Sequence, residues 1–208
     1  MKSELENILH KVGELYQKYG IKSVTMDDVA REIGISKKTL YKHVENKNDL
    51  VSKVVDHILI EKNCLIETII NKNLNAIEEL LEVGIHIIKT IQEYKLSFEY
   101  DLKKYYPLIH NRLHDVRKEK MYNSIINNIK NGIGEGLFRL DMDDEIIAKM
   151  QTSRFISMHN DEFFDSKEMI NPKFILELFI YHIRGIANKK GIEVLEKTLQ
   201  QIDIQEYL

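Results

Sequence analysis

The stretch that decides the fold runs from Thr25 to Lys47 and reads TMDDVAREIGISKKTLYKHVENK. Thr25 is predicted to cap a short helix, because a threonine hydroxyl accepts a hydrogen bond from an N–H of the first helical turn. Two aspartates follow in that turn, where the helix dipole favours carboxylates. The helix is expected to cover Met26 to Ile33 and to stop at Gly34.

Ser36 is a second predicted cap, and it opens a helix from Lys37 to about Val44. Leu40 and Val44 are expected to point inward, while the opposite face is polar and cationic. That face carries Lys37, Lys38, Thr39, Lys42 and His43. Two short helices joined by a glycine turn and packed on a longer first helix predict a tri-helical helix-turn-helix, with the motif at about 24–43 and its recognition helix at 37–44.

Charge along the chain agrees with this prediction. The 208 residues carry a net charge of −3, so bulk electrostatics alone do not indicate a nucleic-acid partner. Residues 35–47, however, hold four lysines against Glu45 alone, which leaves a local balance of +3. A small basic patch on a mildly acidic body suits phosphate contact at one end of the molecule.

The remaining sequence is helical in pattern. Only two prolines and nine glycines interrupt it, too few for a sheet protein that turns about every 8–12 residues. Apolar spacing predicts a first helix ending at Gly20 in a left-handed cap, and the clearest later break at 132–136. Further helices are expected at 47–70, 74–96, 98–104, 107–133, 144–160 and 171–189, with Gly191 separating a short terminal helix. The predicted fold class is all-α, with the helix-turn-helix domain followed by a helical bundle.

Several classes of function lack a signature. Cys64 is the only cysteine, so an intrachain disulfide and a cysteine-based metal cluster are excluded. The chain has no Gly-x-Ser-x-Gly, phosphate loop, dinucleotide fingerprint or His-Glu-x-x-His. We therefore expect no enzyme activity, no catalytic residues, no cofactor and no metal. The longest apolar stretch is too short to span a bilayer, and the N-terminus lacks a signal-peptide core, so a soluble cytoplasmic protein without a membrane partner is expected.

The run from Thr25 to Lys47 resembles the DNA-binding signature of the TetR family of bacterial regulators. Its most diagnostic part is Thr39-Leu40-Tyr41, followed by Lys47 and Leu50 at the family's spacing. The resemblance covers about residues 5–57. Weaker similarity continues at 132–143, which resembles the glycine-rich turn before the dimer-forming helices of that family.

The resemblance implies roles for particular side chains. Thr25 and Tyr41 would donate hydroxyl hydrogen bonds to phosphates. Lys47 stands at the N-terminus of the fourth helix, so both its ammonium and the helix dipole would lie near a further phosphate. The major groove would be faced by Lys37, Lys38, Thr39, Lys42 and His43. The family frequently has Gly or Ala where Lys38 stands, which leaves open whether Lys38 contacts a base or a phosphate.

The family's organisation implies a DNA-reading domain at 1–46 and a ligand-sensing and dimerisation domain at 47–208. A TetR-like repressor would bind a palindromic operator in double-stranded DNA as a homodimer. An apolar or amphipathic small molecule would modulate this binding. The sequence does not distinguish a repressor from an activator. Candidate residues for the effector pocket are the aromatic and polar side chains Tyr94, Phe98, Tyr105, His110, Tyr122 and Phe155. Candidate residues for the dimer interface are Phe155, Phe174, Leu178, Phe179 and His182.

Two other readings stay open. His110 and His114 are four residues apart on a predicted helix, a spacing that allows a metal site together with Asp115 or Glu119. A helical dimer that binds another protein through the basic helix is also compatible with the sequence. A steep salt dependence on duplex DNA would separate the regulator from that second reading.

Overall fold

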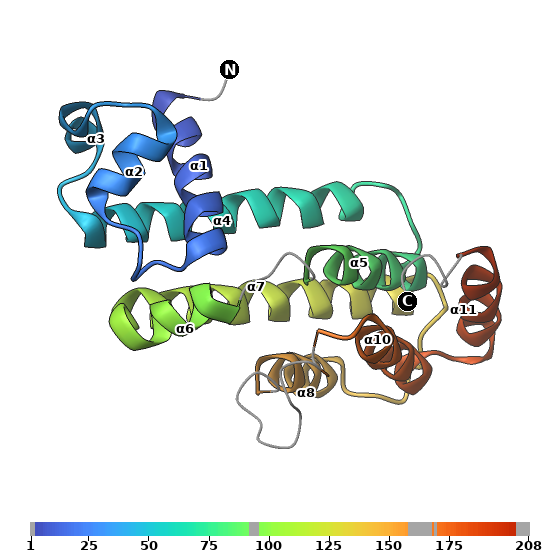
Figure 1. Cartoon of the computed structure of the whole chain (residues 1–208). Coiled ribbons are helices and arrows are strands. Elements are labelled where there is room, and N and C mark those ends of the chain that lie inside the picture. The colour runs from blue at the N-terminus through green and yellow to red at the C-terminus, as the bar shows by residue number, and fades with distance from the viewer. Residues whose placement is uncertain (1–2, 92–95, 158–167, 169, 203–208) are drawn as a thin grey trace. The chain divides into compact units, whose positions relative to one another are not determined.

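The computed structural model describes residues 3–91, 96–157, 168 and 170–202 (Figure 1). Within that part of the chain every regular element is a helix, which confirms the all-α prediction, and one isolated antiparallel bridge joins Phe138 to Ala187. The chain divides into two compact units. One comprises residues 1–65 and 94–115, and the other 66–93 and 116–208. Among the described helices we find none with the length and apolarity needed to cross a membrane.

The first unit holds the predicted helix-turn-helix. Its helices are α1 (Glu4–Tyr19), α2 (Met26–Ile33), α3 (Lys37–His43), most of α4 (Lys47–Ile70), α6 (Leu96–Tyr105) and the start of α7 (Pro107–Gly134). The predicted bounds of α2 and α4 are confirmed. Side-chain caps at Ser3, Thr25 and Ser36 begin α1, α2 and α3.

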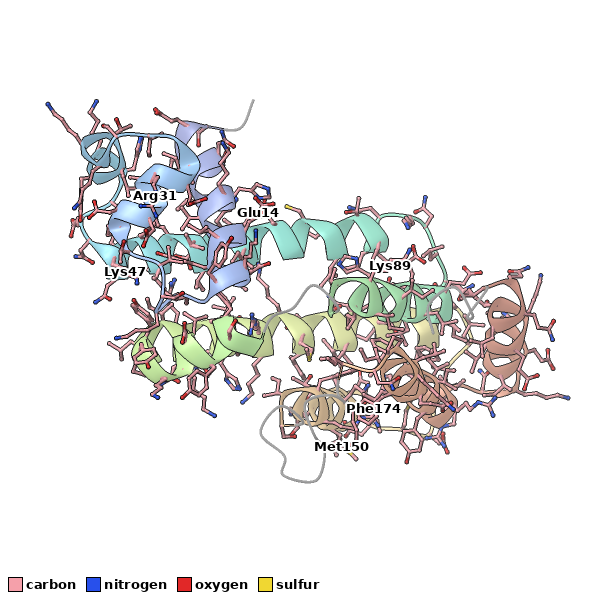
Figure 2. The ribbon with its side chains drawn as sticks, viewed as in Figure 1. Glu14, Arg31, Lys47, Lys89, Met150 and Phe174 are labelled. Carbon is pink, nitrogen blue, oxygen red and sulfur yellow. The ribbon has the colours of Figure 1, made fainter. Side chains whose placement is uncertain are left out.

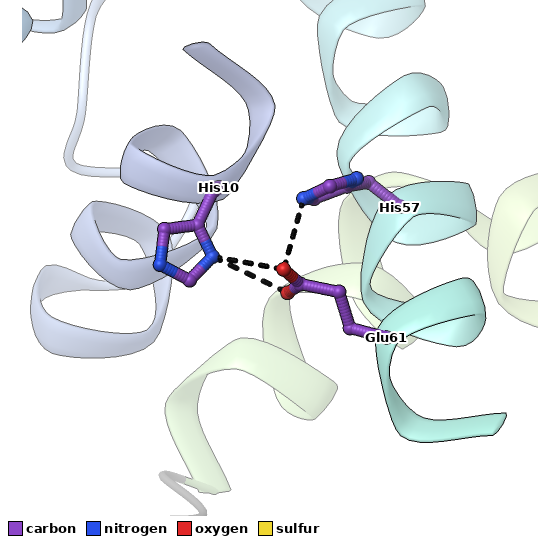
Figure 3. A group of neighbouring side chains, drawn as sticks. All are labelled: His10, His57 and Glu61. Atoms are coloured by element: carbon purple, nitrogen blue, oxygen red, sulfur yellow. Dashed lines mark hydrogen bonds and ion pairs between the residues drawn. The ribbon is translucent and has the colours of Figure 1, made fainter. Parts of the chain in front are cut away.

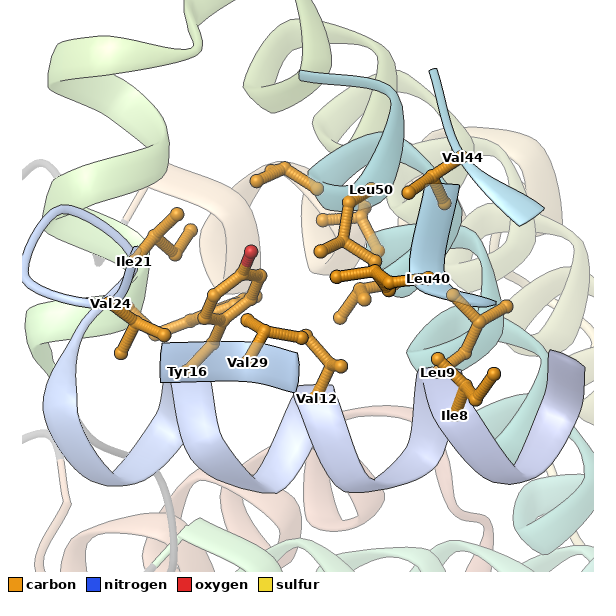
Figure 4. Close-up of a cluster of buried hydrophobic side chains, with 14 of the residues drawn as sticks. Ile8, Leu9, Val12, Tyr16, Ile21, Val24, Val29, Leu40, Val44 and Leu50 are labelled. Atoms are coloured by element: carbon orange, nitrogen blue, oxygen red, sulfur yellow. The ribbon is translucent and has the colours of Figure 1, made fainter. Parts of the chain in front are cut away.

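The core of the first unit is built from apolar side chains of α1, α2, α3 and α4 (Figure 4). Val12 and Tyr16 of α1 are fully buried beside Val29 of α2, Leu40 of α3 and Leu50 of α4. Burying a side chain of leucine size contributes roughly 1.5–3 kcal/mol. A seven-residue helix such as α3 is unstable in isolation. Burial of its Leu40 side chain in this core stabilises it.

Gly20 ends α1 in a conformation that differs from the prediction. Its φ is 81° but its ψ is 155°, which is outside the left-handed helical region. The reason is a tertiary contact with α6. The carboxylate of Asp101 accepts a hydrogen bond from the Lys22 N–H at 2.8 Å, and a Cβ on Gly20 would lie 3.0 Å from the same carboxylate oxygen.

The second unit contains the remaining helices, which are α5 (Ala76–Ile91), α8 (Asp144–Ser157), α10 (Pro172–Ile186), α11 (Lys189–Gln201) and the rest of α7. Helix α5 packs on α10 and α11 (Figure 1). The core joins Ile77 and Leu81 of α5 to Ile129 of α7 and Ile183 of α10. The predicted residues 92–95 of the helix at 74–96, and 158–160 of the helix at 144–160, lie outside the described residues.

The predicted break at 132–136 is confirmed, since α7 ends at Gly134 and Gly136 has a φ of 68°. Gly191, which was predicted to separate a short terminal helix, instead lies inside α11. Gly132 belongs to α7, and a Cβ there would lie 2.2 Å from the ring of Phe138. Gly191 belongs to α11, and a Cβ there would lie 2.3 Å from the carbonyl oxygen of Leu137. The actual break between α10 and α11 is at Ala187 and Asn188, where the Asn188 side chain caps α11. These glycines thus permit close packing rather than chain reversal.

Candidate nucleic-acid interface

The turn between α2 and α3 is set by one glycine. Gly34 has φ 76° and ψ 32°, in the left-handed region that a residue with a Cβ adopts only at a cost. The Gly34 N–H and the Ile35 N–H both donate to the carbonyl of Ala30, which satisfies the end of α2. Ser36 then accepts a hydrogen bond from the Thr39 N–H at 3.0 Å, so α3 begins two residues after the turn.

Helix α3 is fixed through one side and exposed on the other. Leu40 is completely buried and Val44, directly after the helix, is buried as well. Lys38 and Lys42 are exposed, and the Tyr41 ring retains 44% of its accessible surface. This division matches the predicted groove-facing set, because the cationic side chains lie on the face that does not pack.

Lys37 is the one lysine of α3 with an ion pair within the described residues. Its Nζ lies 2.8 Å from Oδ1 of Asp27 on α2, and the hydrogen bond raises the pKa of Lys37 above its ordinary value. Both side chains remain about half exposed or more. An exposed pair of this kind contributes little to stability, so Lys37 can exchange Asp27 for a phosphate at small cost.

Thr39 and His43 complete the predicted groove-facing set. The Thr39 hydroxyl lies 2.8 Å from the Ser36 hydroxyl, within the cap of the helix. The His43 ring is 22% exposed, and its Nε2 lies 3.7 Å from a carboxylate oxygen of Glu4. Both side chains therefore border the exposed cationic face, and each already has a neighbouring polar group.

Thr25 has a structural role that sequence reasoning named only in part. Its hydroxyl accepts a hydrogen bond from the Asp28 N–H at 3.1 Å and donates to the Asp28 carboxylate at 2.6 Å. Hydrogen bonds from Thr25 lower the pKa of Asp28, with the Arg31 guanidinium adding to the effect. The hydroxyl proton and the backbone N–H of Thr25 are both engaged within the capping box, so contact with a phosphate requires Thr25 to release Asp28.

Lys47 is also engaged within the protein. Its Nζ donates to the carbonyl of Ile21 at 2.7 Å and to that of Val24 at 2.6 Å, which ties the start of α4 to the α1–α2 turn. Burial, followed by the nearby charge of Lys22, lowers the pKa of the Lys47 ammonium. An ammonium has three donors, so one remains for a phosphate. Figure 2 labels Lys47 in the first unit, together with Arg31 of α2.

The six residues predicted for an effector pocket are distributed over both units. Phe98, Tyr105 and His110 lie in the first unit, where Phe98 is buried in the core and Tyr105 is 40% exposed. Tyr122 and Phe155 pack against the core of the second unit. Tyr94 lies outside the described residues.

The residues predicted for the dimer interface divide by exposure. Phe179 and His182 are buried within their own chain, and the Phe155 ring packs on Phe179 with centroids 5.5 Å apart. Phe174 and Leu178 of α10 are only partly covered. The exposed apolar side chains nearby in the fold are Ile146, Met150 and Tyr181 of α8 and α10. Met150 was also expected on the interface helix from its sequence pattern, whereas Ile146 and Tyr181 were not.

One polar cluster in the first unit was missed by sequence reasoning. His10 of α1 meets His57 and Glu61 of α4, and this is the one group of three potential metal ligands among the described residues. His110 and His114 do not form such a group there, since His110 faces Glu99 and His114 faces Asp115. The His57–Glu61 spacing was visible in the sequence, but its partner lies 47 residues away.

A short helix after a glycine turn, held by a buried leucine and presenting an exposed basic face, defines the helix-turn-helix class of DNA-binding proteins. Comparison with known proteins narrows the class. Residues 8–54 match the model of a family described as bacterial regulatory proteins, tetR family. That range contains α2, α3 and the start of α4.

Related regulators extend the match beyond this segment. The HTH-type transcriptional regulator YvaF of Bacillus subtilis is 30% identical over 102 residues, which are 49% of this chain and 53% of that protein. An HTH-type transcriptional regulator of Staphylococcus aureus is 26% identical over 155 residues, which are 74% of this chain and 75% of the relative. The chain thus spans about half the length of the first relative and three quarters of the second.

Solved structures share the whole fold at low identity. A transcriptional regulator from Cytophaga hutchinsonii has a TM-score of 0.73 at 17% identity, covering 90% of this chain and 100% of that one. A regulator from Saccharomonospora viridis, solved in complex with choline, has a TM-score of 0.70 at 19% identity, with the same coverage. Residues 8–54 thus carry the DNA-binding segment of the tetR family of bacterial regulatory proteins, and the whole chain shares the fold of solved transcriptional regulators.

Proposed function

We propose that this regulator is a repressor that binds a palindromic operator as a homodimer and releases or tightens it in response to a small molecule. The observation that carries the proposal is the exposed basic face of α3, opposite the buried Leu40. A helix of this kind fits the major groove of B-DNA, where lysine ammonium groups donate to guanine acceptors and to phosphates. The proposed reading side chains are Thr25, Lys37, Lys38, Thr39, Tyr41, Lys42, His43 and Lys47.

Two lysines are the best probes of this face. Lys38 and Lys42 are exposed on α3, and neither supports the core. Phosphate contacts release counterions, so each contact contributes about −0.9 to the slope of log K against log salt. Lys47 is a poorer probe, because its removal also frees the carbonyls of Ile21 and Val24.

Dimerisation is supported by apolar surface in the second unit. Ile146 and Met150 of α8 are 54% and 63% exposed, and Tyr181 of α10 is 72% exposed. Ile146 and Met150 are one turn apart on α8, and the Arg154 guanidinium of α8 lies 5.4 Å from the centroid of the Tyr181 ring. Neighbouring exposed apolar side chains mark protein–protein contact surfaces. A two-fold axis through α8 and α10 would cover them in a four-helix arrangement, together with the partly covered Phe174 and Leu178. Figure 2 labels Met150 on α8 and Phe174 on α10.

The effector is proposed to bind the segment 47–208, with 1–46 as the DNA reader. The compact units divide the chain differently, since most of α4 and all of α6 pack with the reader. Choline bound to the Saccharomonospora viridis regulator illustrates a small-molecule ligand in a protein of this fold. Among the described pocket candidates, Tyr122 and Phe155 are the two that pack against the core of the second unit.

The test is selection of bound duplexes from a random DNA pool, followed by affinity measurements over a range of salt. A palindromic site is expected, with a steep negative salt slope. Lys42→Ala should lower the slope by about one for each subunit, and Lys197→Ala, an exposed lysine of α11, should leave it unchanged. Transcription in vitro from a promoter carrying the selected site should fall when the protein is added.

A folded dimer that enriches no site at low salt would overturn the proposal and favour a protein partner for the basic helix. A rise in transcription at the selected site would instead keep DNA binding and replace repression by activation.

A further inference from the structure

Three potential metal ligands meet between α1 and α4 within the first unit (Figure 3). His10 comes from α1, while His57 and Glu61 are one turn apart on α4. Figure 3 shows both imidazole rings directed at the Glu61 carboxylate. The three ligand atoms all lie within 4.8 Å of one another.

The spacing of these atoms suits a tetrahedral ion. Nδ1 of His10 and Nε2 of His57 lie 3.1 and 3.3 Å from the same carboxylate oxygen of Glu61. Ligand atoms about 2.1 Å from a tetrahedral ion are about 3.4 Å from one another. Two of the three distances between ligand atoms are therefore already close to the required length, and the third is at most 4.8 Å.

His57 gives the cluster a buried anchor. Its side chain is 9% exposed, and its Nε2 is buried without a hydrogen bond of acceptable geometry, although Glu61 lies near it. A buried ring nitrogen without a satisfied hydrogen bond is costly, and coordination to a cation would satisfy it. His10 and Glu61 are partly exposed, at 43% and 34%, which leaves a route for the ion from solvent.

Glu14 lies behind the cluster on α1. Its carboxylate is 3.9 Å from Nε2 of His10, the nitrogen that faces away from Glu61. When Nδ1 binds a metal, the ring proton must sit on Nε2, and a carboxylate beside that nitrogen stabilises the required tautomer. Glu14 is thus placed as an outer partner of the same site.

We propose that His10, His57 and Glu61 bind one divalent transition-metal ion of the zinc class. Two imidazoles and a carboxylate favour such ions over Ca²⁺ or Mg²⁺, which prefer oxygen ligands throughout. Three protein ligands leave a coordination position for water. The ion joins α1 to α4 inside the unit that contains the helix-turn-helix, so it cross-links the scaffold that supports α3. The site does not depend on the proposed repressor function.

The experiment titrates Co²⁺, then Zn²⁺, into the untagged full-length protein after treatment with chelator and desalting. One Co²⁺ per chain is expected, with the visible absorption of a tetrahedral complex, and Zn²⁺ should displace it. His10→Gln is expected to weaken binding at least 100-fold, and Glu14→Gln about tenfold, in the range of outer-partner effects. His114→Gln is the matched control, because its ring has the same 43% exposure as His10 and should leave affinity unchanged.

Substitution of the half-exposed His10 avoids unfolding the core, and circular dichroism of each variant checks this. Glu61→Gln provides a second test from α4 and should also weaken binding at least 100-fold. Fewer than one Co²⁺ per chain, or equal affinity in wild type and His10→Gln, would overturn the site. Operator binding is measured separately, so failure here leaves the proposed function intact.

Discussion

Lys47 illustrates how one side chain can belong to the scaffold and to the proposed interface together. Its ammonium holds the carbonyls of Ile21 and Val24, and the associated burial lowers its pKa. Loss of the side chain leaves two carbonyls without their donor, which costs roughly 1–3 kcal/mol when such groups are buried. A weakened DNA complex in Lys47→Ala would therefore combine a lost phosphate contact with a loosened α1–α2 turn.

His182 is the side chain from which we derive a pH dependence. It is buried in α10, and its Nε2 has no hydrogen-bond partner among the described residues. Burial, followed by the Arg154 charge, lowers its pKa from 6.5 to about 4. The folded state thus favours the neutral ring, whereas the unfolded chain takes up a proton near pH 6.5. The resulting stability is present above pH 6.5 and is lost as the pH falls towards 4, by roughly 3 kcal/mol in total.

We predict that His182→Gln reduces the acid sensitivity of the protein. Between pH 7.5 and 5 the free energy of unfolding of the wild type should fall by about 2 kcal/mol more than that of the variant. Urea unfolding at a fixed protein concentration measures the difference. His114→Gln, with an exposed ring, should retain the full acid sensitivity. Parallel pH profiles for wild type and His182→Gln would contradict this assignment.

The helix caps were predictable because they depend on residues close together in the sequence. The contacts between residues far apart in the sequence were not predictable. Thr25 and Ser36 were expected to cap helices, and each accepts a hydrogen bond from the backbone N–H three residues along the chain. The carboxylate of Asp101 beside Gly20 and the position of Glu61 beside His10 depend on residues far away in sequence. No spacing rule for a single helix finds such contacts.

At the scale of the element, the α2–α3 turn depends on a single positive φ. A Cβ on Gly34 would meet no atom within 4 Å, so the cost of replacing it comes from the backbone alone. An L-residue in the left-handed region is less stable by roughly 1–2 kcal/mol, and asparagine tolerates it better than alanine.

We predict that Gly34→Ala destabilises the protein by roughly 1 kcal/mol, or about 3 °C in Tm, and that Gly34→Asn has a smaller effect. Thermal unfolding followed by circular dichroism measures both variants. Equal Tm values for the alanine and asparagine variants would show that the backbone conformation at this turn carries no such cost.

Gly191 shows the limit of interpreting every glycine as a helix break. It was predicted to separate a short terminal helix, because glycine commonly ends helices. It instead lets the Leu137 carbonyl approach α11 closely, as Gly132 does for the Phe138 ring inside α7. A sequence pattern reports the backbone freedom of glycine, but it does not report which neighbour occupies the space of the missing Cβ.

At the scale of the whole molecule, the helical class and the short helices around Gly34 were predictable because both follow from short-range periodicity. The effector pocket has no such local pattern. Its candidate aromatics were chosen by residue type, and the described ones fall in both compact units. The dimer candidates Phe179 and His182 followed an apolar stripe that turned out to be the buried side of α10.

We predict that charges on the exposed apolar surface of α8 and α10 dissociate the dimer. Met150→Glu and Tyr181→Glu should each give a monomer by light scattering after size exclusion, because an unpaired carboxylate in an apolar interface is strongly unfavourable. Leu108→Glu is the control, since Leu108 is 84% exposed at the start of α7 and lies in the first unit. A dimer that persists in both α8 and α10 variants would move the interface elsewhere.

The division of α3 between a buried leucine and an exposed polar face also bears on how such a regulator diverges. Lys38 and Lys42 contribute nothing to the core, so their replacement leaves folding almost unchanged. Duplicated copies of the gene are thus free to acquire new target sequences through a few codon changes, without compensating mutations in the scaffold. The same property makes this helix a suitable site for a combinatorial library aimed at altered specificity.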